Sequence, residues 1–93
     1  MNKEKLLRTI VEGLKKEGAV KIGLFGSYAR GEQKRKSDID ILVKFAKPKS
    51  LLEFVGIEQE LSEKTGKKIE LLTEEFISPH IIGKIKKEIV ELG

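Results

Sequence analysis

Residues 38–45 constrain the fold more than any other segment. Every second residue of this run is apolar: Ile39, Ile41, Val43 and Phe45. Successive side chains of a strand point to opposite faces, so this alternation predicts a β-strand. The other face begins with the only two aspartates of the chain, Asp38 and Asp40, whose Cα atoms would lie roughly 6.5–7 Å apart. The chain must therefore build a sheet that carries two neighbouring carboxylates on one face.

The rest of the chain alternates between helical and extended patterns. Apolar residues at helical spacing predict helices over residues 3–17, 51–65 and 79–90, and short apolar runs predict strands over 19–25 and 68–72. The connecting segments are two short turns and a polar loop, at residues 28–30, 73–76 and 32–37. This order of elements predicts an α/β fold of the α+β, two-layer type.

The size of the chain limits what it can do alone. Its 93 residues, 39% hydrophobic and 37% charged, indicate one compact soluble domain over residues 1–93 rather than a disordered tail. A folded chain of this size buries only roughly 60–65% of its unfolded surface, which leaves no residues for a deep cleft between two lobes. We therefore expect a partner to complete any large substrate site.

Several classes of protein are excluded or disfavoured by composition. The chain has no Cys, which excludes disulfides, thiol catalysis and Cys-based zinc sites. It has neither the apolar core of a signal peptide nor a run of roughly 20 apolar residues, so we expect a cytoplasmic protein without a membrane partner. The net charge of +4 suits anionic ligands, but one Tyr, no Trp and four Phe offer little for base stacking. Direct binding of nucleic acid is therefore not expected.

Two short motifs have both a chemical and an ordinary interpretation. Asp38 and Asp40 offer hard oxygen ligands for Mg²⁺ or Mn²⁺, as two-metal nucleotidyl transfer requires, although a lone pair of strand acids is more often solvated. Gly26 and Ser27 follow the strand at 19–25, where backbone N–H groups can hold phosphate. Alternatively, they form an ordinary turn in which Ser27 caps a helix.

The two motifs together are far more specific. Gly26-Ser27, ten intervening residues and Asp38-x-Asp40, within GSYARGEQKRKSDIDILV, resemble the signature of the DNA polymerase β-like nucleotidyltransferase superfamily. The length and the order of elements resemble a minimal nucleotidyltransferase (MNT). The positions that match are Gly26, Ser27, Ala29, Arg30, Gly31, Ser37, Asp38 and Asp40. The resemblance implies the minimal polymerase β-like fold, a small mixed sheet with helices packed on one face.

The resemblance also implies a nucleotide site and a metal site. ATP, as co-substrate, would be held at the nucleotide-binding positions Gly26, Ser27, Arg30 and Ser37. Two Mg²⁺ ions, or Mn²⁺, would be bound by the catalytic acids Asp38, Asp40 and Glu70. Arg30 has an ordinary alternative as well, because its guanidinium can either clamp phosphate or pair with a surface Glu.

Glu70 is the candidate for the third acid. It lies in the strand at 68–72, where family members usually carry Asp followed by Leu, and adjacent strands are roughly 4.8 Å apart, so the carboxylates can converge. Glu70 would act as a metal ligand or as the general base for the incoming hydroxyl. Alternatively, it is a solvent-facing Glu that pairs with a Lys.

MNT proteins of this length resemble the antitoxins of type VII-like HEPN/MNT toxin-antitoxin systems. The resemblance implies an enzyme that transfers AMP from ATP to a tyrosine hydroxyl of its partner, a HEPN (higher eukaryotes and prokaryotes nucleotide-binding) ribonuclease toxin, and so inactivates it. The last helix and the loop at 31–37 are the expected docking surfaces. Two alternatives stay open: an antitoxin that neutralises by binding alone, and a small basic nucleic-acid-binding protein that uses residues 34–36.

Overall fold

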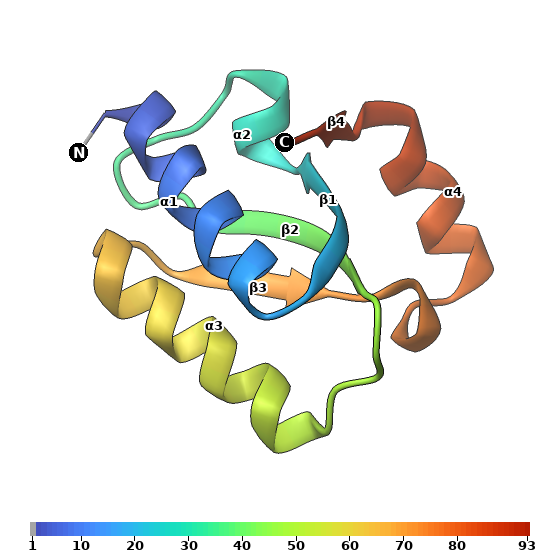
Figure 1. The fold of residues 1–93 in the computed structure, drawn as a ribbon. Coiled ribbons are helices and arrows are strands. Elements are labelled where there is room, and N and C mark those ends of the chain that lie inside the picture. Colours follow the sequence, from blue (N-terminus) through green and yellow to red (C-terminus); the bar gives the residue numbers. More distant parts are fainter. Residues whose placement is uncertain (1) are drawn as a thin grey trace.

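The computed structural model describes residues 2–93 and contains a four-stranded sheet with helices packed against it (Figure 1). Its elements are, in chain order, α1 (Lys3–Lys16), β1 (Ala19–Phe25), α2 (Ser27–Arg30), β2 (Ile39–Phe45), α3 (Leu51–Thr65), β3 (Ile69–Leu72), the 3₁₀ turn η1 (Glu74–Phe76), α4 (Pro79–Glu88) and β4 (Val90–Glu91). The predicted order of elements is confirmed up to α4. The strand β4 was not predicted.

Local signals set the ends of α3 and α4. Ser50 and Glu53 have the Ser-x-x-Glu spacing that predicts a capping box, and the structure contains it: each side chain accepts a hydrogen bond from the backbone N–H of the other residue. Gly66 ends α3 in the left-handed conformation, with φ 69°. Ser78 caps α4 and Pro79 occupies its first position. Both helices therefore start where the sequence predicts.

The sheet has the strand order β3-β2-β1-β4. β1 runs antiparallel to β2 and β4, whereas β2 and β3 are parallel and are joined across the sheet by α3. The prediction that the last helix continues to Val90 is wrong, because α4 ends at Glu88. Val90 and Glu91 instead pair with Leu24 and Gly23, which satisfies backbone groups at the outer edge of β1.

The main core lies between the sheet and the helices α1 and α3, which share one side of the sheet in Figure 1. Its most deeply buried side chains come from a helix and two strands: Ile10, Leu14, Ile39, Ile41 and Ile69. The isoleucines of β2 therefore point toward α1 and α3, as the alternation predicts. The aspartates that alternate with them belong to the opposite face.

This opposite face is only partly covered. Ile85 of α4 packs there against Phe25 and Leu42 in a second, smaller core. The other apolar side chains of α4 are more exposed, and Ile81 is 50% exposed. Within the described residues, no helix has the length and apolar character needed to cross a membrane.

The turn after β1 requires glycine. Gly26 has φ 74° and ψ −156°, a conformation that is almost confined to glycine. A Cβ atom at this position would overlap the carboxylate of Asp40. The backbone at Gly26 therefore lies directly against the side chain of Asp40.

Replacing Gly26 should consequently lower the free energy of unfolding more than replacing an ordinary glycine does. We expect Gly26→Ala to lower the free energy of unfolding by about 1–3 kcal/mol, because the new side chain is strained and displaces Asp40. In the control Gly56→Ala, the new Cβ lies in α3 with no atom within 4 Å, so a gain of up to about 1 kcal/mol is expected. Urea denaturation measures both changes. A Gly26→Ala variant as stable as the natural protein would contradict the expectation.

Candidate functional site

Three carboxylates gather on the open face of the sheet. Asp40 and Glu70 are direct neighbours in the parallel pairing of β2 with β3, and their side chains hydrogen-bond to each other. Asp38 lies just before β2. The Nζ atom of Lys68 is 3.9 Å from Asp38 Oδ2 and 3.9 Å from Glu70 Oε1. The predicted catalytic acids are therefore brought to one place, with one ammonium group between two of them.

Side chains of α3 hold Glu70 in this cluster. The Oγ atom of Ser62 accepts a hydrogen bond of 3.0 Å from the N–H of Ile69, and Glu58 Oε2 accepts one of 2.8 Å from the N–H of Leu71. These bonds satisfy donors of β3 that no neighbouring strand covers. Ile69 and Leu71 point into the core, so Glu70 between them points to the open face.

The cluster carries a strong electrostatic cost. The pKa of Asp40 is raised from 3.8 to about 6, first by partial burial and then by its hydrogen bond to Glu70 and the negative charges of Glu70 and Asp38. Arg30 opposes this shift only weakly. Without a cation, the raised pKa keeps Asp40 protonated to a higher pH than an ordinary aspartate.

The turn beside the cluster binds an anion of the protein itself. The N–H of Gly26 donates a hydrogen bond of 3.1 Å to Glu88 Oε1, and Arg30 Nη1 donates one of 3.0 Å to Glu88 Oε2. These donors lower the pKa of Glu88, with the Gly26 N–H as the largest cause. Arg30 also pairs with Glu32 through Nε. The turn therefore presents converging donors to two oxygen atoms of one carboxylate.

The other two predicted nucleotide-binding residues are Ser27 and Ser37, and their hydroxyls take no part in the hydrogen bonds to Glu88. Ser27 begins α2, and its hydroxyl has no hydrogen-bond partner among residues 2–93. Ser37 lies in the preceding loop, where its Oγ atom accepts a hydrogen bond of 2.8 Å from the N–H of Lys34. The structure thus places Gly26, Ser27 and Arg30 beside the carboxylate cluster. The side chain of Ser37 instead makes a hydrogen bond within its own loop.

Glu88 is the site residue that the sequence analysis missed. It lies in the last turn of α4 and is 62 residues from Gly26, so no local pattern announces the contact. The pairing of β4 with β1 brings the end of α4 to the turn. The contact between Glu88 and Gly26 could be predicted only by first predicting that β4 pairs with β1.

The acids suit a divalent cation although they do not form a finished site. No group of three Asp, Glu, His or Cys side chains among residues 2–93 is already arranged around a metal position. The donor set is nevertheless made of hard carboxylate oxygens, held close together against their repulsion, and Lys68 already places a positive charge between two of them. Asp38, Asp40 and Glu70 are therefore the side chains that could hold such an ion once they close around it.

The pKa of Asp40 predicts a pH-dependent cost to stability. Because its folded pKa lies above the unfolded value, the unfolded chain loses this proton first, and the folded state is destabilised as the pH rises from about 4 to above 6. Asp40→Asn should therefore raise the free energy of unfolding at pH 7.5 by about 1 kcal/mol, a figure reduced for solvent screening, and by much less at pH 4. Urea denaturation in EDTA at both pH values measures this, with Glu63→Gln as a surface control. A gain independent of pH would contradict it.

Comparison with known proteins agrees with this geometry. Residues 7–92 match the family model described as a nucleotidyltransferase domain. A Methanocaldococcus jannaschii relative, provisionally named a protein adenylyltransferase, is 45% identical over 92 residues, and the match covers 99% of each chain. Protein adenylyltransferase MntA of Thermococcus cleftensis is 37% identical over 89 residues, with 90% of each chain covered.

A solved structure shares the fold. One chain of a toxin-antitoxin complex with AMP-PNP matches with a TM-score of 0.85 and 26% identity, over 94% of this chain and 72% of that chain. The family model and the relatives cover almost the whole length of the present chain. The protein is therefore a nucleotidyltransferase that belongs to the nucleotidyltransferase domain family, among its minimal, MNT-type members.

Proposed function

We propose that this protein is a divalent-metal-dependent protein adenylyltransferase and the antitoxin of a HEPN-family ribonuclease toxin. It transfers AMP from ATP to a tyrosine hydroxyl of that toxin. The observation that carries the proposal is the direct contact between Gly26, in a turn that binds an anion, and Asp40, in the carboxylate cluster. The names of the relatives and the toxin-antitoxin complex with AMP-PNP support it.

The triphosphate would bind where Glu88 now lies. Phosphate oxygens carry more charge than one carboxylate and can accept the same hydrogen bonds from the Gly26 N–H and from Arg30. The Ser27 hydroxyl offers a further donor. Glu88 must withdraw when the nucleotide enters, because both anions need the same donors.

Transfer is a substitution at the α-phosphorus of ATP. The tyrosine oxygen attacks this phosphorus, and the bond to the oxygen that bridges the α- and β-phosphates breaks, so pyrophosphate leaves with the electron pair. Glu70 is separated from the phosphate-binding turn by Asp40, because β2 lies between β1 and β3, and it accepts the hydroxyl proton. Asp38 and Asp40, with Glu70, would hold Mg²⁺ or Mn²⁺, which when bound neutralises charge on the phosphates.

The exposure of the site is consistent with a protein substrate. The side chains of Asp38 and Glu70 are 40% and 46% exposed, so this chain alone does not exclude water from the reacting groups. Adenylyl transfer in competition with hydrolysis requires the acceptor to displace that water. A bound toxin would supply the missing wall of the site together with the acceptor tyrosine.

The proposal predicts loss of transfer when the metal-binding acids are neutralised. Asp38→Asn combined with Asp40→Asn should abolish transfer of labelled AMP from ATP to a co-expressed HEPN toxin, detected by intact-mass spectrometry of the toxin. Co-purification with the toxin should persist, which is the control for folding and binding. Undiminished labelling would refute the proposed role. Complete protection of cells by this variant without labelling would favour the antitoxin that acts by binding alone.

The position of Glu88 predicts tighter nucleotide binding when its charge is removed. Glu88→Gln should lower the Kd for ATP by roughly tenfold, or about 1.4 kcal/mol, because the Gly26 N–H and Arg30 lose their internal anion. Isothermal titration calorimetry with Mg²⁺ present measures this. Glu91→Gln removes a nearby charge that makes no contact with the turn and should leave the Kd unchanged. Weaker binding by Glu88→Gln would show that Glu88 instead positions Arg30 for phosphate.

A further inference from the structure

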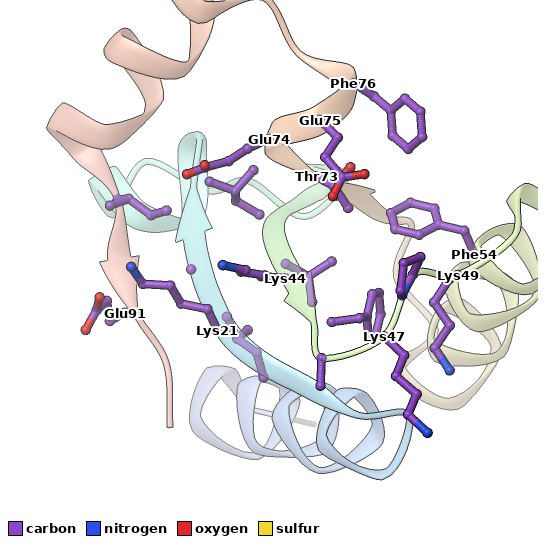
Figure 2. A pocket seen from close by; sticks show the side chains of 18 of the residues that line it. Lys21, Lys44, Lys47, Lys49, Phe54, Thr73, Glu74, Glu75, Phe76 and Glu91 are labelled. Carbon is purple, nitrogen blue, oxygen red and sulfur yellow. The ribbon is translucent and has the colours of Figure 1, made fainter.

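A groove of about 800 Å³ lies on the open face of the sheet (Figure 2). β1 and β2 form its floor, and the segment at 44–49, the start of α3 and the segment at 73–76 contribute to its walls. Leu42 lines the groove and lies two residues from Asp40 on the same face of β2. The groove therefore begins where the cluster of acids ends.

The groove carries three lysines that have no ion-pair partner within the described residues. They are Lys21, Lys44 and Lys47. Lys21 and Lys44 are also direct partners in the antiparallel pairing of β1 with β2. Like charges in directly opposite positions destabilise a sheet. This pair is a cost to the free protein that an anion lying across both strands would remove.

The acids of the groove lie toward its borders. Glu74 is paired with Lys86 at 3.1 Å, and Figure 2 shows Glu75 beside Thr73 and Glu91 over the edge strand β4. The buried hydroxyl of Thr73 has no hydrogen-bond partner within the described chain. The charge of Lys21 and Lys44 thus stays open to a ligand.

Apolar side chains adjoin the lysines. Phe54 and Phe76 lie on the same side of the groove in Figure 2, and Phe76 is 80% exposed. Leu51 and Leu52, in the first turn of the helix that carries Phe54, are 77% and 85% exposed. An exposed aromatic side chain in a groove that also holds unpaired charges is typical of a protein-binding surface rather than of a solvated face.

We propose that this groove binds an acidic segment of the protein that accepts AMP, with an apolar or aromatic side chain of that segment against Phe76. The proposal rests on the proposed function and adds where and how the protein substrate is recognised. On this face of β2 only Leu42 lies between Asp40 and Lys44, so their Cα atoms are roughly 13 Å apart. A segment held by Lys44 therefore places a nearby hydroxyl within reach of the acids. Of the two docking surfaces that the sequence suggested, the groove includes the end of the last helix, through Lys86 and Ile89, but not the loop at 31–37.

The test uses a fluorescent random copolymer of glutamate and tyrosine as the probe and fluorescence anisotropy as the readout. We expect the natural protein to bind it, and Lys44→Glu to weaken binding by about tenfold. The same substitution should raise Tm, because the new carboxylate faces Lys21 across the strands. Loss of binding together with a gain in stability cannot be due to misfolding. Lys5→Glu, at the exposed start of α1, makes the same change of charge and should leave binding unchanged.

Other outcomes would overturn the proposal. The first is that the natural protein fails to bind the copolymer. The second is that it binds a lysine-tyrosine copolymer equally well. The third is that Lys44→Glu and Lys5→Glu weaken binding of the copolymer equally. A loss as large in Lys34→Glu combined with Lys36→Glu would place the segment at the loop instead. AMP transfer to the copolymer is measured separately. Groove-dependent binding without transfer would count against the proposed activity while supporting the groove as the docking site.

Discussion

The burial of two isoleucines in β2 fixes the direction of the acids on which the site depends. Ile39 and Ile41 are fully buried between the sheet and the helices α1 and α3. A shift of one residue in the pairing of β2 would expose both isoleucines and drive Asp40 into the core, so hydrophobic burial specifies the register strongly. The partial burial and the repulsion that raise the pKa of Asp40 are therefore sustained by packing on the other side of the same strand.

What the sequence could predict was local. The alternation of β2 and the capping box of Ser50 and Glu53 depend on residues close in sequence, and both are confirmed. The strand β4 and the contact of Glu88 with Gly26 depend on a pairing between β1 and β4, which lie far apart in the sequence. Val90 continues the apolar spacing of α4, so its pattern favoured a longer helix, and only the unsatisfied edge of β1 makes it a strand.

The sequence offers two interpretations for Glu70 and for Arg30: a role in catalysis or binding, and an ion pair on the surface. The structure contains the contacts that both interpretations predict. Glu70 is close to Lys68 as well as hydrogen-bonded to Asp40. Arg30 pairs with Glu32 and Glu88 while it flanks the anion-binding turn. Groups that bind charged substrates find substitutes within the chain when those substrates are absent, since an isolated charge is costly even when it is half-buried. Side-chain pairing in the free protein is therefore no argument against a role in binding.

On its open face, β2 carries negative charge at its start and positive charge near its end. Asp38 and Asp40 lie at its start and Lys44 near its end, with Leu42 between them. A strand is stiff and its rise per residue is nearly constant, so the spacing between the acids and the lysine changes little as the protein moves. In the proposed function, this spacing links binding of the acceptor segment to AMP transfer. A segment that binds Lys44 with its register shifted by one residue would carry its hydroxyl away from Asp40 and Glu70. A small domain can select its acceptor in this way, through the register of a docked segment.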